Sequence, residues 1–192
     1  MRRKLLTTAV ILLAFTGMMS AGTLAMFTDT DAVAANTFTA GKISLSTNPT
    51  TAAVSFANMM PGDTVTNPVV VTNDAGSAAL RYAVSSVATN TDTKGLKDQL
   101  VLTVKTGVTT CTTAGFTATG IVAYTGDLDS AAGKIIGDSA QGAQAGDRTL
   151  AIGASETLCF QVNLPLATGN TYQSATTTAT FTFDSEQTAN NP

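Results

Sequence analysis

The sequence contains no histidine and no tryptophan, and only 12% of its 192 residues are charged. Without histidine, the chain lacks the usual general base of Ser-His-Asp and Cys-His catalysis and the paired ligands of a His-x-x-x-His zinc helix. The formal net charge is −3, and no basic patch of the kind that binds nucleic acid is present. Most hydrolase chemistry therefore lacks its usual residue, and we expect no nucleic-acid partner.

Apolar residues make up 44% of the chain, which is enough for a core in one domain. The sequence is rich in threonine and valine, and β-branched residues favour strands. Apolar alternation recurs between turns that are about 8–12 residues apart. We predict an all-β fold, a jelly-roll-like β-sandwich of about 8–9 strands. The expected strands are 42–46, 53–56, 64–72, 80–84, 100–104, 121–124, 158–164 and 178–183.

Three further features refine this prediction. Pro68 cannot donate a ladder hydrogen bond, so it indicates an edge position or a bulge in the third expected strand. Residues 94–99 are expected to form one or two helical turns. Residues 126–147 are rich in Gly, Ala, Asp and Ser, and we expect irregular loops there with at most one helical turn.

The N-terminus has the layout of a secretory signal peptide. Three basic residues at positions 2–4 precede an apolar run over 5–19, and small residues follow. The run of about 15 residues is shorter than the roughly 20 that a helix needs to cross a bilayer, so cleavage is favoured over an uncleaved anchor. Cleavage after Ala21 or after Ala25 fits the small-residue pattern. Loss of three positive charges would change the net charge from −3 to −6.

The only two cysteines, Cys111 and Cys159, lie beyond the signal peptide. In an exported chain such a pair usually forms a disulfide, here closing a loop of about 49 residues and contributing ~4 kcal/mol by chain entropy. Zinc ligation and redox catalysis are disfavoured, because histidine and a Cys-x-x-Cys spacing are both lacking. Cys159 alternates with Leu158 and Phe160, so we expect the bond to tie a loop or strand onto the outside of a sheet.

Acidic residues in the expected loop region raise the question of calcium binding. Asp127, Asp129, Asp138 and Asp147 lack the spacing and the terminal glutamate of an EF-hand loop. We interpret them as solvated loop acids, and we predict no metal site and no cofactor.

Residues 26–38 form a different kind of segment. Phe27, Val33 and Phe38 are isolated apolar side chains among small polar residues, so the segment can extend easily. It could be the first strand of its own sandwich or a strand donated to a neighbouring subunit. The pattern alone favours the first interpretation.

Several short motifs occur in a characteristic order. Residues 22–29 and 36–45 look like a signal-peptide junction and first strand, and residues 60–63 and 69–77 look like a Pro-Gly-Asp turn and an Asn-x-Gly-Ser hairpin. Together they resemble the TasA/camelysin family. The resemblance is good over residues 20–85 and again over 172–183, and it is slight between about 90 and 150.

The resemblance implies a jelly-roll subunit of extracellular or biofilm-matrix fibres. It implies export with a dedicated signal peptidase that cuts between Ala25 and Met26, with no membrane attachment afterwards. It also implies head-to-tail assembly of copies by donation of the mature N-terminal segment, with Phe27, Val33 and Phe38 as subunit contacts. This reverses the preference that the pattern alone gives for residues 26–38.

Some members of the family are described as metalloendopeptidases. Because this chain has no histidine, we do not carry that activity over, and we expect a protein that is not an enzyme. A secreted metal-dependent endopeptidase and a monomeric cell-surface binding module remain the alternatives. The expected organisation is a signal peptide (1–25), an extended candidate donor strand (26–40), a β-sandwich (41–187) and a polar tail (188–192).

Overall fold

The computed structural model describes residues 39–51, 53–55, 57–90 and 92–191. By its internal contacts the chain divides into two units, Met1–Thr39 and Ala40–Pro192. The cleavage position at Ala25 and Met26 lies outside the described residues, as do the predicted contact residues Phe27, Val33 and Phe38. The strands and helices of the described residues all belong to the second unit.

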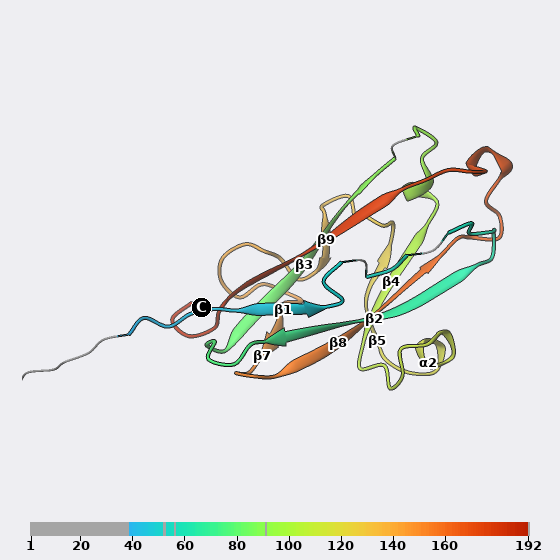
Figure 1. The fold of residues 1–192 in the computed structure, drawn as a ribbon. Helices are drawn as coiled ribbons and strands as arrows, with labels where there is room; N and C mark the ends of the chain where they lie inside the picture. Colours follow the sequence, from blue (N-terminus) through green and yellow to red (C-terminus); the bar gives the residue numbers. More distant parts are fainter. Residues whose placement is uncertain (1–38, 52, 56, 91, 192) are drawn as a thin grey trace, which may run out of the picture. The chain divides into compact units, whose positions relative to one another are not determined.

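This unit consists of two antiparallel β-sheets (Figure 1). The five-stranded sheet has the order β1-β2-β8-β4-β5. In the four-stranded sheet, β3 pairs with β9 on one side and with the short strands β6 and β7 on the other. The predicted all-β sandwich is confirmed. The strands are β1 (Leu45–Asn48), β2 (Thr64–Asn73), β3 (Leu80–Thr89), β4 (Val101–Thr106), β5 (Ile121–Gly126), β6 (Lys134–Ile136), β7 (Arg148–Leu150), β8 (Ser155–Asn163) and β9 (Thr178–Gln187).

Three short helices interrupt the strands, and none of the described helices is long and apolar enough to cross a membrane. They are η1 (Leu96–Asp98), α2 (Thr113–Ala118) and η2 (Asn170–Tyr172). The first of them confirms the helical turn that was predicted over 94–99.

The core forms where the inner faces of the two sheets meet. Strand alternation directs every second side chain inward, so β3 contributes Leu80, Tyr82 and Val84, and β8 contributes Leu158 and Phe160. All five side chains are buried, and full burial of such a side chain contributes about 1.5–3 kcal/mol. These inward rows match the alternation that predicted the strands.

A partly buried polar contact also links the two sheets. The Tyr82 hydroxyl on β3 donates to the Glu156 carboxylate on β8 at 2.8 Å, and Arg148 Nε donates to the same carboxylate at 3.2 Å. Burial, with the hydrogen bond to Glu156, raises the pKa of Tyr82. The hydroxyl is therefore a fixed donor that satisfies the carboxylate inside the sandwich.

Several sequence predictions of local structure need correction. Residues 53–56 were predicted as a strand, but the described residues of this segment form none. Strands β6 and β7 have three residues each, too few to give an alternation signal, and they form only because β3 offers them a partner. Helix α2 begins after Thr112, whose side chain accepts a hydrogen bond from Gly115 N; the threonine-rich sequence there indicated no helix.

Pro68 lies where strand pairing tolerates it. It is opposite Cys159 of β8, while β1 pairs only with Val70–Asn73 of β2. Strand β2 therefore has one neighbour at Pro68, and a missing N–H leaves no ladder bond unmade. The predicted edge position is confirmed.

The structure contains the predicted disulfide between Cys111 and Cys159, whose Cα atoms are 5.6 Å apart. Cys159 is on the face of β8 opposite Leu158 and Phe160, so the bond fixes the segment before α2 to the outer face of the five-stranded sheet. Phe116 of α2 is buried there, and the Lys105 ammonium lies 4.7 Å from the centre of its ring. The expected attachment of a loop to the outside of the sheet is found.

We expect the double variant Cys111→Ala/Cys159→Ala to lose about 2–5 kcal/mol of unfolding free energy, because the reduced chain gains a long unconstrained loop when it unfolds. Urea unfolding checks this. Wild-type protein in reducing buffer should show a similar loss, and an unchanged unfolding midpoint in both samples would contradict the structural role of the bond.

Candidate functional site

The unpaired edges of the sheets are the first candidate site. Among the described residues, β9 pairs only with β3, β5 only with β4, and β1 only with β2. An edge strand presents a row of free N–H and C=O groups, which can pair with another strand. Strands β6 and β7 likewise pair only with β3 among the described residues, so the fold offers several edges on which a further strand could be added.

Strand β9 is the longest of these edges and has few features that block pairing. It faces β3 through ten consecutive residue pairs without a register shift. Over Thr178–Phe183 it alternates threonine with alanine or phenylalanine, and it carries no charge, proline or glycine. Proteins usually protect such edges with charges, prolines or bulges. Here acidic residues occur only in the second half of the strand, at Asp184 and Glu186.

The chain enters the sandwich beside the turn between β2 and β3. Ser44 Oγ and Ser46 Oγ each donate to the Asp74 carboxylate at 2.7 Å, and Ser44 N donates to Ser77 Oγ at 3.0 Å. The hydroxyl donors, Ser46 first and Ser44 second, hold the pKa of Asp74 below its ordinary value. These contacts form a clamp that fixes the residues just after the N-terminal segment to the body of the sandwich.

Asn73 supports this clamp from inside. It is fully buried, and its Nδ2 donates to the carbonyls of Ala78, Leu150 and Ala151 at 2.9, 3.2 and 3.0 Å. The turn between β2 and β3 is thereby held against the end of β7. Gly76 adopts a φ of 77° in this turn, a conformation that glycine tolerates best.

The described residues between β1 and the next turn, 49–51, 53–55 and 57–59, are here called the cover segment, and they form no strand. Ala53, Val54 and Met59 are partly buried and pack against the core. The turn after the segment is fixed, because Met60 N donates to the Asp63 carboxylate at 2.8 Å and Gly62 N donates to Leu164 O at 2.7 Å. The Pro-Gly-Asp turn therefore anchors one end of the cover segment, and β1 anchors the other.

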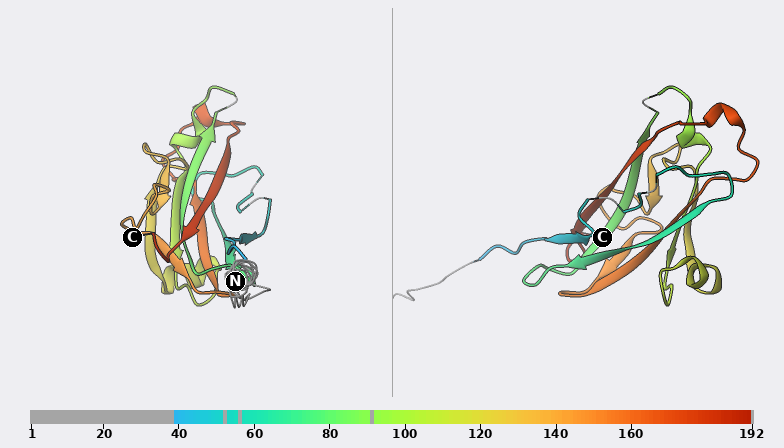
Figure 2. Two further views of the ribbon diagram at one scale, coloured as in Figure 1. Left: turned by 90° about the vertical axis from the view of Figure 1, so that its left-hand side faces the viewer. Right: turned by 45° about the vertical axis from the view of Figure 1, so that its right-hand side comes forward.

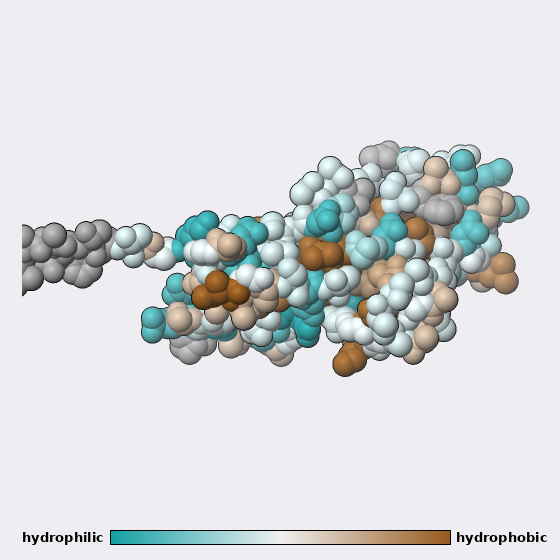
Figure 3. Space-filling view, turned by 60° about the horizontal axis from the view of Figure 1, so that its bottom comes forward, coloured by the Kyte–Doolittle hydropathy of each residue, from teal (hydrophilic) through white to brown (hydrophobic). Residues whose placement is uncertain are grey.

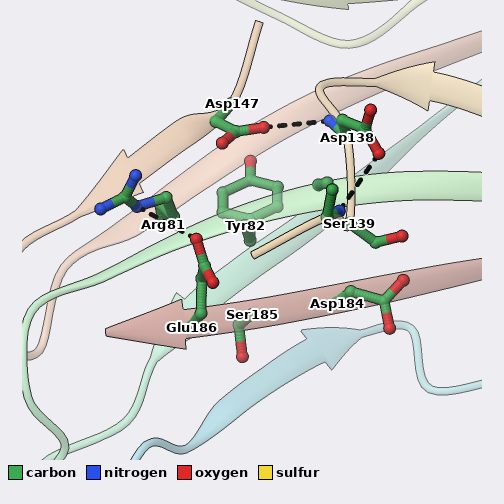
Figure 4. A pocket seen from close by; sticks show the side chains of 10 residues that line it. Arg81, Tyr82, Asp138, Ser139, Asp147, Asp184, Ser185 and Glu186 are labelled. Carbon is green, nitrogen blue, oxygen red and sulfur yellow. Dashed lines mark hydrogen bonds and ion pairs between the residues drawn. The ribbon is translucent and has the colours of Figure 1, made fainter. Parts of the chain in front are cut away.

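A small hollow on the outer face of the four-stranded sheet is a second candidate site (Figure 4). It lies between the strands β3 and β9 and the loop before β7. Asp147 accepts hydrogen bonds from Asp138 N at 3.0 Å and from Gln144 N at 2.8 Å. The Lys134 ammonium bonds the Asp138 carboxylate and lowers the pKa of that group. These acids hold the loop in place.

Arg81 of β3 and Glu186 of β9 are among the charged strand residues that also line the hollow. Arg81 is buried, with its Nε 3.4 Å from a Glu186 carboxylate oxygen, and it also donates to Asn191 O. Glu186 accepts from Gly142 N at 3.1 Å. The contacts connect the loop and the end of the described chain to the sheet, so we interpret the hollow as part of the fold.

Large exposed apolar side chains do not gather into one patch on the face that Figure 3 shows, where apolar positions are separated by polar surface. A broad apolar docking face is therefore not a feature of that side. Over this unit as a whole, the most exposed large apolar side chains are Met60, Val87, Ile121, Ile152 and Leu166.

The donor groups that a catalytic metal would need do not come together in the described part of the chain. It contains no group of three or more His, Cys, Asp or Glu side chains that could hold a metal ion. Both cysteines are in the disulfide, and Asp129 pairs with the Lys97 ammonium at 3.0 Å. A catalytic zinc needs about three protein ligands and an open position, and these residues do not fit it.

The described residues thus define a two-sheet β-sandwich with open edge strands. The chain belongs to the camelysin family: the sequence model described as Camelysin metallo-endopeptidase matches residues 1–191. TasA is a member of this family, so the resemblance inferred from the short motifs is confirmed. The match also includes residues 90–150, where those motifs were uninformative. No curated protein matches the chain in a sequence comparison.

Sequence reasoning found one part of the candidate site and missed another. It identified the disulfide and the motifs around the turns. It did not identify the Asp74 clamp or the role of Asn73, because single serine, asparagine and aspartate residues are frequent in turns and carry no signal of a distant partner. The signal that was available was the motif over residues 69–77.

We expect Asp74→Asn to weaken the clamp at neutral pH, because the amide accepts hydroxyl hydrogen bonds less strongly than a carboxylate. The folded-state pKa of Asp74 is lowered, so the contribution is present above the ordinary pKa near 4 and is lost as pH falls through the folded value. The deficit of the variant against wild type in urea midpoint should therefore shrink from pH 7 to about pH 3.

Asp127→Asn is the matched control, since the Asp127 carboxylate is exposed and has no hydrogen bond in the described structure. A deficit of Asp74→Asn that stays constant over this pH range would show that the clamp does not depend on the charge of Asp74.

Proposed function

We propose that this protein is a secreted structural subunit that polymerises into extracellular or biofilm-matrix fibres. In this proposal each subunit donates its mature N-terminal segment, residues 26–38, to a neighbouring copy. Membership of the family that includes TasA supports the proposal. The observation that carries it is the open, largely uncharged edge of β9.

The physical basis would be strand addition to a sheet edge. Backbone hydrogen bonds then give an affinity that grows with the length of the added strand, and side chains set the register. Residues 26–38 could extend to about 40 Å, more than the roughly 33 Å of a ten-residue strand such as β9. In a regular strand Phe27 and Val33 lie on one face and Phe38 on the other.

Donation of this kind makes an open assembly. Each subunit gives its segment to one neighbour and receives a segment from another, so the contact is heterologous and a filament grows where the rotation does not close. The Asp74 clamp would hold the base of the donated segment firmly to its own subunit, so that pairing at one end is transmitted to the body.

Export is part of the same proposal. Cleavage between Ala25 and Met26 would release the segment from the membrane, and a disulfide is typical of proteins that work in oxidising compartments. The expected location is the extracellular matrix or the cell surface, with signal peptidase as a partner only during export.

The family description raises one alternative, a secreted metal-dependent endopeptidase. The absence of histidine from the sequence, and the lack of a grouped ligand set in the described residues, argue for a structural role instead. A monomeric cell-surface binding module is the other alternative.

We expect mature protein, residues 26–192, to form filaments and a chain of residues 39–192 to stay monomeric. The shorter chain keeps every described strand but lacks the donor. Negative-stain microscopy and light scattering at rising concentration check this, with equal urea midpoints as the control for folding. Fibres from the shorter chain would contradict donation by residues 26–38.

The same preparations separate the alternatives. The structural role predicts neither stoichiometric zinc nor chelator-sensitive cleavage of casein by the mature protein, and a positive result in both would support the peptidase. Mature protein that stays monomeric at all concentrations would support the binding module.

A further inference from the structure

We infer that the cover segment shields the open edge of β9 in the isolated subunit, and that residues 26–38 of a neighbouring copy displace it and pair with β9. The inference rests on the proposed function and names the partner surface of the donated strand. The backbone N–H and C=O groups of β9 that point away from β3 are the groups with which a donated strand would pair.

The contacts of β3 establish that direction. Ser86 N donates to Gly133 O at 2.8 Å, and Ala88 N donates to the Asp129 carboxylate at 3.2 Å. Both acceptors belong to the segment on the β6 side of β3, away from β9. Residues 86 and 88 of β3 therefore occupy non-hydrogen-bonded positions in the pairing with β9.

The residue pairing between β3 and β9 shows which residues of β9 have the same orientation. Ser86 lies opposite Phe181 and Ala88 lies opposite Ala179. Hydrogen-bonded and non-hydrogen-bonded pairs alternate along an antiparallel ladder. The N–H and C=O groups of Ala179, Phe181 and Phe183 consequently point to the open edge, whereas the groups of the intervening threonines point to β3.

The same three residues of β9 direct their side chains to the core. Ala179, Phe181 and Phe183 are partly buried and pack against it. The ring of Phe181 meets Phe160 of β8 edge-on, with ring centres 5.1 Å apart. The open edge of β9 thus combines free backbone groups with incompletely covered aromatic rings, which is the chemistry that an added strand with apolar side chains would satisfy.

The cover segment shields this side of the sandwich without pairing with it. Figures 1 and 2 show the segment, in teal, on the side where β9 forms the edge. Its described residues make no hydrogen bond to β9, and they hold their place through the packing of Ala53, Val54 and Met59. A donated strand could replace this packing and add a backbone ladder, so exchange would favour the intermolecular partner.

The other edges are less suitable acceptors. Strand β5 has six residues, and its ladder with β4 shifts register between Val104 and Lys105. Strand β1 has four residues, and β6 and β7 have three each. None of these strands combines the length of β9 with an unpaired covering segment on the same side.

Amide hydrogen exchange read by NMR tests the inference at single residues. In monomeric mature protein the amides of Ala179, Phe181 and Phe183 should exchange rapidly, and those of Thr180 and Thr182 slowly. In fibres we expect the first three to slow at least 100-fold, while the threonine amides are slow in both states.

The outcomes distinguish the two proposals. Fibres in which the amides of Ala179, Phe181 and Phe183 still exchange rapidly would overturn β9 as the acceptor and leave donation to another edge intact. Failure of the mature protein to form fibres would overturn both.

Two variants, one in β9 and one in the cover segment, test the inference by their effect on fibre assembly. Ala179→Pro removes an N–H that faces the open edge and spares the ladder with β3, so we expect at least a tenfold loss of fibre yield from monomer that still folds. Thr180→Ala changes only a side chain and is the matched control, expected to assemble normally. Fibre yield of Ala179→Pro equal to that of the control would overturn the inference.

The variant in the cover segment is Val54→Asp, and it leaves β9 unchanged. Val54→Asp should weaken the packing of the segment on the core and make the edge of β9 more accessible, so we expect fibres to form several-fold faster than in wild type. Assembly that is unchanged or slower would overturn the role of the cover segment.

Discussion

The antiparallel pairing of β3 with β9 is the interaction on which the rest of the structure depends. It runs through ten residue pairs and completes the four-stranded sheet, and the inner face of that sheet supplies much of the core. The same pairing satisfies only one side of β9 among the described residues. In an edge strand, alternate residues point their N–H and C=O groups to the neighbouring strand, and the residues between them point theirs to solvent. Strand β9 therefore both stabilises the sheet and can accept another strand.

The other fixed contacts of the sandwich restrict which segments can change conformation. The disulfide holds α2 on the outer face of the five-stranded sheet, and the Asp74 clamp holds the start of the sandwich to the turn after β2. By contrast, the cover segment is fixed at its ends, with only apolar packing between them among its described residues. A rigid frame with one weakly held segment is suited to strand exchange, since the segment can leave without disturbing either ladder.

The family is described by a metallo-endopeptidase activity, and this chain has no histidine, the residue that most often holds a catalytic zinc. Fold and activity are separable, because a sandwich of this kind can be retained while a ligand set is lost or never acquired. The structural proposal uses what the residues do provide: long threonine-rich strands, few charges and a backbone edge.

Sequence patterns predicted the parts of the fold in which one face alternates strongly. Strands β2, β3, β8 and β9 have inward apolar rows, and each was found near its predicted place. Strand β9 continues beyond Phe183 to Gln187, where polar side chains give no alternation but the backbone still pairs with Leu80–Ala83. Apolar residues at 53–56 indicated a strand, yet the described residues Ala53 and Val54 pack on the core without any ladder.

The candidate site was predictable only in part for the same reason. Two cysteines in an exported chain indicate a disulfide from their number alone. A clamp such as Ser44 and Ser46 on Asp74 depends on residues 28–30 positions apart that only the folded chain brings together. The open edge of β9 likewise follows from topology, which local alternation does not specify.

The central claim is that residues 26–38 bind to the folded sandwich of another copy. Titration of a synthetic peptide of residues 26–38 into the chain of residues 39–192, followed by calorimetry, tests it most directly, with a scrambled peptide as the control. The account predicts saturable binding of one peptide per sandwich and none of the scrambled sequence. Equal binding of the two peptides, or no binding of either, would contradict it.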